Sequence, residues 1–115
     1  MAGRITSRLK DILDAIGQIE LLLKDKGPDD LDKDRVLTAA YERFLEIISE
    51  ASRHIPEIFK VDSPQVPWRG IADIGNWLRH AYHNVDREIL WRIYADGKLS
   101  ELRAVVSRIL ANPPR

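Results

Sequence analysis

The stretch ITSRLKDILDAIGQIELLL, residues 5–23, decides the fold. Its apolar residues recur every three or four positions, which is the period of one face of an α-helix. These residues are Ile5, Leu9, Ile12, Leu13, Ile16, Ile19 and Leu23. Such a stripe must be buried against other helices, because no part of the chain shows the alternation of apolar and polar residues that predicts a sheet. The sequence therefore predicts an all-α protein.

A second helix is expected over residues 33–53. Gly27-Pro28 ends the first helix, and a group of aspartates precedes the second helix start. That group consists of Asp29, Asp30 and Asp32. The inner face of the second helix is predicted from the apolar residues at helical spacing, which are Val36, Ala40, Phe44, Ile47, Ile48 and Ala51.

Prolines interrupt the helical pattern between residues 54 and 68. Pro56, Pro64 and Pro67 forbid a continuous helix and indicate a loop with a short turn. Pro67 suits the first turn of a third helix over about residues 68–78, because that turn needs no amide donor. The segment RHAYHN that follows is expected to form a turn. Asn84 is a plausible N-cap for a short helix that runs through residue 94.

The last helix is predicted after Asp96-Gly97, which breaks the short helix before it. Its apolar stripe consists of Leu99, Leu102, Val105, Val106, Ile109 and Leu110. The expected architecture is an up-and-down bundle of four to five helices with mostly short connections. A length of 115 residues suits one domain, so we expect a single domain over residues 1–115.

Composition narrows the classes of function. The chain has no cysteine, which excludes a disulfide scaffold, zinc–cysteine sites and a cysteine nucleophile, and is compatible with a reducing cytosol. Lysine plus arginine equals aspartate plus glutamate at 18 each, so net charge favours neither a nucleic acid nor a membrane. Early charged residues exclude a signal peptide, and no apolar run could span a bilayer. We expect a cytoplasmic protein without a membrane partner.

Three tryptophans leave two interpretations open. Trp68, Trp77 and Trp91 either pack in the core or form an apolar strip for a partner.

The residues that could take part in catalysis are concentrated in the segment NWLRHAYHNVD, residues 76–86. It combines Asn76, Arg79, His80, Tyr82 and His83. Cleavage of a phosphodiester needs a general base, a general acid and a cation for the developing phosphorane charge. RNA supplies its own nucleophile in the 2′-hydroxyl, so histidine and arginine suffice and no metal or cofactor is required. The alternative is that these residues form a polar network with a structural role.

The chain resembles HepT-type toxins of the HEPN ribonuclease superfamily over nearly its whole length. The stretch AAYERFLEIISEASRHIP is similar to the family's second-helix signature, with Arg43, Glu46 and Glu50 on pattern. The stretch VPWRGIADIGNWLRHAYHNVD is similar to its active-site stretch, and REILWRIYADGKLSELRAVVSRIL follows its last two helices.

One position departs from the family motif, which is an arginine, four to six residues, and then His-x-Tyr. His80-Ala81-Tyr82 supplies the second half, but alignment places the arginine at position 75, which is Gly75 here. Arg79 lies four residues later, so on a continuous helix it shares that face. Because helical side chains lean toward the N-terminus, Arg79 could deliver its guanidinium near position 75. Arg69 is a weaker substitute, on a different face.

The resemblance implies a HEPN-like helical homodimer with both copies of the motif at the dimer cleft. It implies metal-independent RNA cleavage, in which we expect His80 as general acid or base, Arg79 as the phosphate-binding cation, and Tyr82 in the site. Asn76 and His83 are expected to contact the substrate.

A partner is also implied, namely an MNT-type nucleotidyltransferase antitoxin that transfers AMP from ATP to Tyr82 and silences the toxin. The alternative function is a catalytically degenerate helical dimer that acts as a protein-binding module. Gly75 favours that alternative, and the His80-x-Tyr82 match favours the ribonuclease.

Overall fold

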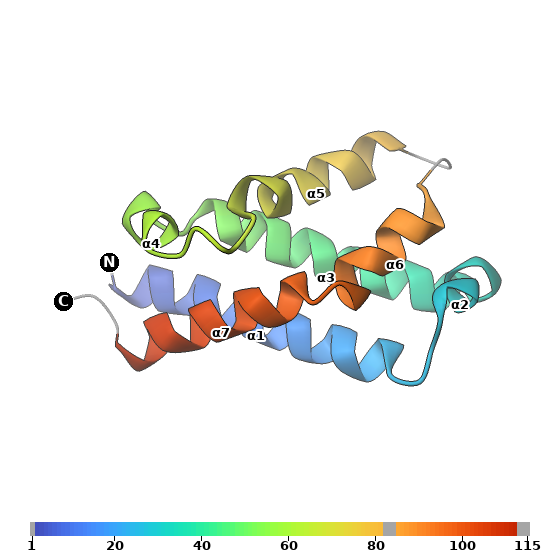
Figure 1. The fold of residues 1–115 in the computed structure, drawn as a ribbon, viewed down its shortest axis with the longest axis horizontal. Coiled ribbons are helices and arrows are strands. Elements are labelled where there is room, and N and C mark those ends of the chain that lie inside the picture. The colour runs from blue at the N-terminus through green and yellow to red at the C-terminus, as the bar shows by residue number, and fades with distance from the viewer. Residues whose placement is uncertain (1, 82–84, 113–115) are drawn as a thin grey trace.

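The fold is known from a computed structural model that describes residues 2–81 and 85–112, and every regular element within them is an α-helix (Figure 1). The helices are α1 (Ala2–Leu23), α2 (Pro28–Lys33), α3 (Arg35–Arg53), α4 (Glu57–Val61), α5 (Trp68–Ala81), α6 (Arg87–Ala95) and α7 (Lys98–Ala111). Five of these have nine or more residues, and only α2 and α4 are shorter. The predicted all-α bundle is confirmed.

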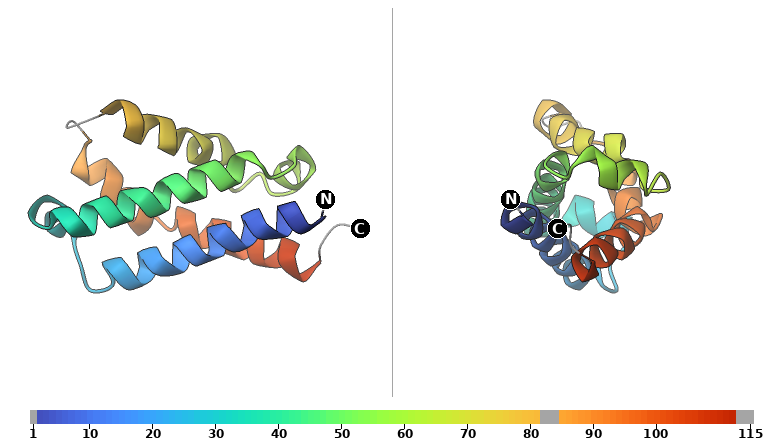
Figure 2. Two further views of the ribbon diagram at one scale, coloured as in Figure 1. Left: turned by 180° about the vertical axis from the view of Figure 1, so that it is seen from behind. Right: turned by 90° about the vertical axis from the view of Figure 1, so that its left-hand side faces the viewer.

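The long helices run alternately along the molecule. α1, α3 and α5 alternate in direction, and α6 and α7 return together in the direction of α3 (Figure 1). The start of α1, α4 and the end of α7 therefore lie at one end, and α2 and the end of α5 at the other. The end-on view in Figure 2 shows α5 at the periphery, and its main packing partner is α3. None of the described helices is both long and apolar enough to cross a bilayer.

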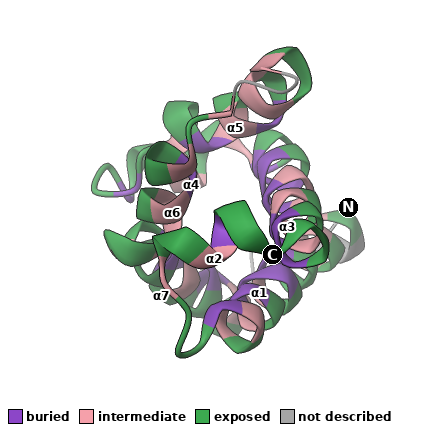
Figure 3. Ribbon diagram, turned by 90° about the vertical axis from the view of Figure 1, so that its right-hand side faces the viewer, coloured by how far each residue is buried: buried purple, intermediate pink, exposed green. Residues whose placement is uncertain are grey.

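The predicted stripe of α1 forms the centre of the core. Its fully buried members are Leu9, Ile12, Ile16, Ile19 and Leu23. They pack against α3 on one side and α7 on the other. Figure 3 shows that the buried positions of the long helices face the interior. The three tryptophans are half-buried and pack against this core, as the simpler interpretation of them predicts.

The predicted inner face of α3 is partly wrong. Ile48 and Ala51 are buried, but Val36 is 81% exposed and the neighbouring Leu37 is buried instead. The buried face continues through Tyr41 and Leu45. α3 carries apolar residues on two adjacent faces, and its contacts with α1, α2 and α5 decide which face is covered.

The aspartates after Gly27 belong to a short helix that the sequence did not predict. Asp29 and Asp30 lie in the first turn of α2, where negative charge is favourable. The Asp30 carboxylate accepts a hydrogen bond from the Gly27 amide at 2.7 Å. Asp34 then caps α3 by accepting from the Leu37 amide. A second short helix, α4, occupies part of the expected proline-rich loop.

The expected turn after residue 78 is wrong at its beginning. α5 continues through Ala81, so Arg79 and His80 are helical. The N-cap of the next helix is Asp86 and not Asn84, because the Asp86 carboxylate accepts from the first amides of α6. Tyr82, His83 and Asn84 lie outside the described residues.

Candidate active site

The last two turns of α5 carry the candidate site residues that the structure describes. Asn76, Arg79 and His80 are spaced by three and four positions, so they share one face of the helix. All three side chains are exposed to solvent. The structure therefore brings these three predicted residues together. Tyr82 and His83 follow directly in the chain and lie outside the described residues.

α5 is held on α3 by polar contacts close to this face. The Ser49 hydroxyl donates to the Ala72 carbonyl at 2.9 Å and accepts from the Gly75 amide at 3.0 Å. Arg53 donates to the same Ala72 carbonyl through Nε at 3.2 Å and through Nη2 at 2.7 Å. Side chains of α3 thus set the position of the helix that presents His80.

Gly75 lies where α3 and α5 approach closely. A Cβ atom added at Gly75 would lie 3.1 Å from the Ser49 Oγ and 3.2 Å from the Arg79 Nη1. The Arg79 guanidinium is therefore folded back over the backbone of residue 75, in the direction in which helical side chains lean. The absence of a side chain at Gly75 accommodates both the serine and the guanidinium.

Arg69 lies away from this cluster. It lines a surface pocket beside α4, together with Lys60 and Trp68. Arg69 precedes Arg79 by ten residues, which corresponds to roughly 15 Å along a helix. The structure thus keeps Arg69 apart from His80, whereas Arg79 lies in the same last turn of α5 as His80.

The second-helix signature residues occupy different places. Arg43 is exposed. Glu50 lies toward the end of α3, where its Oε1 is 3.2 Å from the His54 Nε2 and its Oε2 is 3.8 Å from the Arg53 Nη1. The hydrogen bond with His54 lowers the pKa of Glu50, and the charges of Arg53 and Arg8 lower it further. His54 is the C-cap residue of α3.

The contact between Ser49 and Gly75 is not among those predicted from the sequence. Two features of the sequence point toward such a contact. Ser49 and Ser52 are small residues one turn apart on α3, and a glycine inside a helix permits close approach of a neighbour. Within residues 2–81 and 85–112, no three His, Cys, Asp or Glu side chains gather in a way that could hold a metal ion.

Comparison with known proteins gives one consistent family. The family model described as "Ribonuclease HepT-like" matches residues 12–109. A probable ribonuclease HepT of Thermococcus cleftensis is 39% identical over 101 residues, which cover 83% of this chain and 92% of that protein. A putative RNase of Methanocaldococcus jannaschii is 34% identical over 97 residues, which cover 84% of this chain and 80% of that protein. No solved structure matches the chain.

Proposed function

Because the chain belongs to the HepT-like ribonuclease family, we propose that it is the ribonuclease toxin of a toxin–antitoxin pair, with RNA as its substrate. One observation carries the proposal for this chain, which lacks the motif arginine. The Arg79 guanidinium lies over Gly75, in the last turns of α5 that also carry the exposed His80. A cation is therefore present in the same end of α5 as the histidine even though position 75 cannot supply one.

The residues suit cleavage by the 2′-hydroxyl of RNA. The 2′-oxygen attacks the adjacent phosphorus and its proton passes to a general base, while the bond from phosphorus to the 5′-oxygen breaks and a general acid protonates the leaving oxygen. The products are a 2′,3′-cyclic phosphate and a 5′-hydroxyl. His80 moves one of these protons, and Arg79 stabilises the charge that develops on the phosphorane oxygens. Asn76 and His83 contact the substrate.

The reaction moves two protons, and His80 can act as only one of the two groups at a time. A homodimer with both copies of the motif at a shared cleft would present a second His80. One copy could then act as the base and the other as the acid. The need for both a general acid and a general base therefore supports the proposal of a homodimer, because the second copy supplies the second histidine.

The proposed toxin is silenced by modification of Tyr82. An MNT-type nucleotidyltransferase antitoxin transfers AMP to Tyr82, which places a phosphate charge two residues from His80. That phosphate would pair with Arg79 and occupy the place of an RNA phosphate. Mass mapping after incubation with the cognate enzyme, ATP and Mg²⁺ should find AMP on Tyr82. AMP only on Tyr94, or none with an active enzyme, would contradict this step.

A second candidate function is a catalytically inactive dimer that binds a protein partner. Gly75 is the observation that favours it, because its contact with Ser49 gives the glycine a structural reason that needs no catalysis. The two functions differ in whether the protein cleaves RNA.

The test is cleavage of total cellular RNA in EDTA by the wild type and by His80→Ala. We expect cleavage by the wild type and a loss of about 10²- to 10⁴-fold in the variant, which is the effect of removing a general acid or base. Circular dichroism controls for folding. Equal cleavage by both proteins would remove His80 from the mechanism, and no cleavage by the wild type would favour the binding module.

A further inference from the structure

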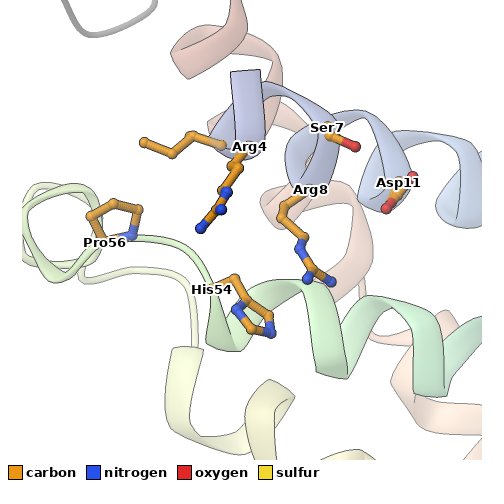
Figure 4. Close-up of a pocket in the computed structure, with 7 residues that line it drawn as sticks. Arg4, Ser7, Arg8, Asp11, His54 and Pro56 are labelled. Atoms are coloured by element: carbon orange, nitrogen blue, oxygen red, sulfur yellow. The ribbon is translucent and has the colours of Figure 1, made fainter. Parts of the chain in front are cut away.

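A surface pocket lies between the start of α1 and the end of α3, at the opposite end of the molecule from the tip of α5 (Figure 1). It has a volume of about 640 Å³ and is lined by Arg4, Ile5, Ser7, Arg8, Asp11, His54 and Pro56. Figure 4 shows Arg4 and Arg8 extending from α1 toward His54, with Asp11 further along α1. Two guanidinium groups and an imidazole therefore point into one space.

The charges of this pocket favour an anion. Arg4 and Arg8 form no ion pair with any of the described residues. Asp11 opposes them from the edge of the pocket, and Glu50 is shared between His54 and Arg53. Guanidinium groups bind phosphate oxygens through short, charge-assisted hydrogen bonds, and a pair of them on one helix face suits a phosphodiester.

The end of α3 lies beside both this pocket and α5, which carries the candidate active site. Arg53 reaches the Ala72 carbonyl of α5, and the next residue, His54, lines the pocket. Ala72, Asn76 and His80 repeat every four residues, so they follow one side of α5 from the level of Arg53 to its tip. The α5 face that leads to His80 therefore begins close to the end of α3 that lines the pocket.

From these observations we propose that the Arg4–Arg8–His54 pocket binds the phosphate backbone of the RNA strand outside the cleavage site. The inference rests on the proposed function, because it takes RNA as the substrate. The eight residues from Ala72 to His80 span roughly 12 Å of helix. A stacked strand advances about 3.4 Å per nucleotide, so the pocket lies at least about four nucleotides from the scissile bond.

Binding to RNA, measured in EDTA on a His80→Ala background that does not cleave, tests the pocket separately from catalysis. Arg4→Ala/Arg8→Ala should weaken the binding of a single strand of roughly 12 nucleotides by about tenfold, the effect of losing a charge-assisted contact. The slope of log K against log salt should fall by about 0.7 for each phosphate released. A strand of roughly three nucleotides is too short to occupy the pocket and the active site together, so the substitutions should weaken its binding less than that of the long strand.

Lys24→Ala/Lys26→Ala is the matched control, because it removes the same charge from the segment that follows the other end of α1. It should leave binding within about twofold of the background if the effect is local. Glu50→Gln should act in the opposite direction and tighten binding, since it removes the carboxylate beside His54. Arg4→Lys/Arg8→Lys retains both charges and should retain the salt slope.

The outcomes separate this inference from the proposed function. A loss that is equal for the short and the long strand, or equal for the lysine control, would overturn the pocket as a backbone site. An unchanged affinity for the long strand would overturn it as well. If the wild type cleaves no RNA and the Arg4/Arg8 dependence is nevertheless found, the pocket stands and the proposed function fails.

Discussion

At the scale of single residues, Tyr41 shows how one buried polar group can make stability depend on pH. Its side chain is fully buried in α3, and its hydroxyl donates to the Leu90 carbonyl of α6 at 2.7 Å. Burial raises the pKa of Tyr41 well above its ordinary value of 10.0. The folded state therefore holds the Tyr41 proton more tightly than the unfolded chain does.

Stability should consequently fall as the pH rises from about 10 through the raised folded value, because only the unfolded chain loses the proton there. Tyr41→Phe should cost about 1–2 kcal/mol at neutral pH, because the variant loses the bond to Leu90. The variant should also remove a loss of about 1 kcal/mol per pH unit above pH 10. Urea unfolding of both proteins at about pH 7 and 11 measures this. A parallel alkaline loss in the variant would show that other groups cause it.

At the scale of helices, the contact of α3 with α5 is the one that presents the candidate site. The Ser49 hydroxyl is fixed by two hydrogen bonds, so it cannot move away from a methyl group at position 75. The Arg79 guanidinium is the end of a flexible side chain and can move. A methyl group at Gly75 should therefore be opposed mainly by Ser49.

Gly75→Ala should destabilise the protein by about 1 kcal/mol, because overpacking costs about 1–3 kcal/mol and the gain in helix propensity offsets about 1 kcal/mol of it. In a Ser49→Ala background the same substitution should be neutral or stabilising. Thermal or urea unfolding of the four proteins yields the coupling energy, which we expect to exceed about 0.5 kcal/mol. Additive effects would mean that the serine does not limit the approach of the two helices.

The helices could be predicted from the sequence better than their faces and ends. The sequence predicts the buried face of α1 correctly, because the apolar stripe of this helix occupies a single face. In α3, Val36 and Leu37 begin two competing faces, and only packing against neighbouring helices decides between them. The end of α5 was placed too early because a cluster of polar residues resembles a turn. Arg79 and His80 are nevertheless compatible with a last helical turn, where positive charge is favourable.

The candidate site was predictable as a set of residue types and not as a geometry. The sequence predicts Asn76, Arg79 and His80 as site residues from the segment that contains them, but their common face appears only because α5 continues through the turn expected after residue 78. The approach of Ser49 to Gly75 has only an indirect signal in the sequence, a glycine inside a helix and small residues on α3, because which residues meet depends on how α5 packs on α3. For the same reason the pocket between Arg8 and His54 has no signal in the sequence, since the two residues are far apart in the chain.

At the scale of the whole molecule, the proposed mechanism needs two copies of the chain. Sedimentation equilibrium at micromolar concentration should give about twice the chain mass of 13.2 kDa. The reason is chemical, since each copy offers one motif histidine and the reaction moves two protons. A strict monomer that cleaves RNA would show that a single copy supplies both the acid and the base.

We propose that this chain is an active ribonuclease in which Arg79 takes the place of the missing motif arginine. Single-turnover cleavage of one RNA in EDTA by Arg79→Ala and by Arg69→Ala tests this proposal, with circular dichroism as the control for folding. Removal of a group that stabilises transition-state charge costs about 10²- to 10³-fold, and we expect that loss for Arg79→Ala. Arg69→Ala should remain close to the wild-type rate. Equal losses in the two variants, or a larger loss for Arg69→Ala, would contradict the claim.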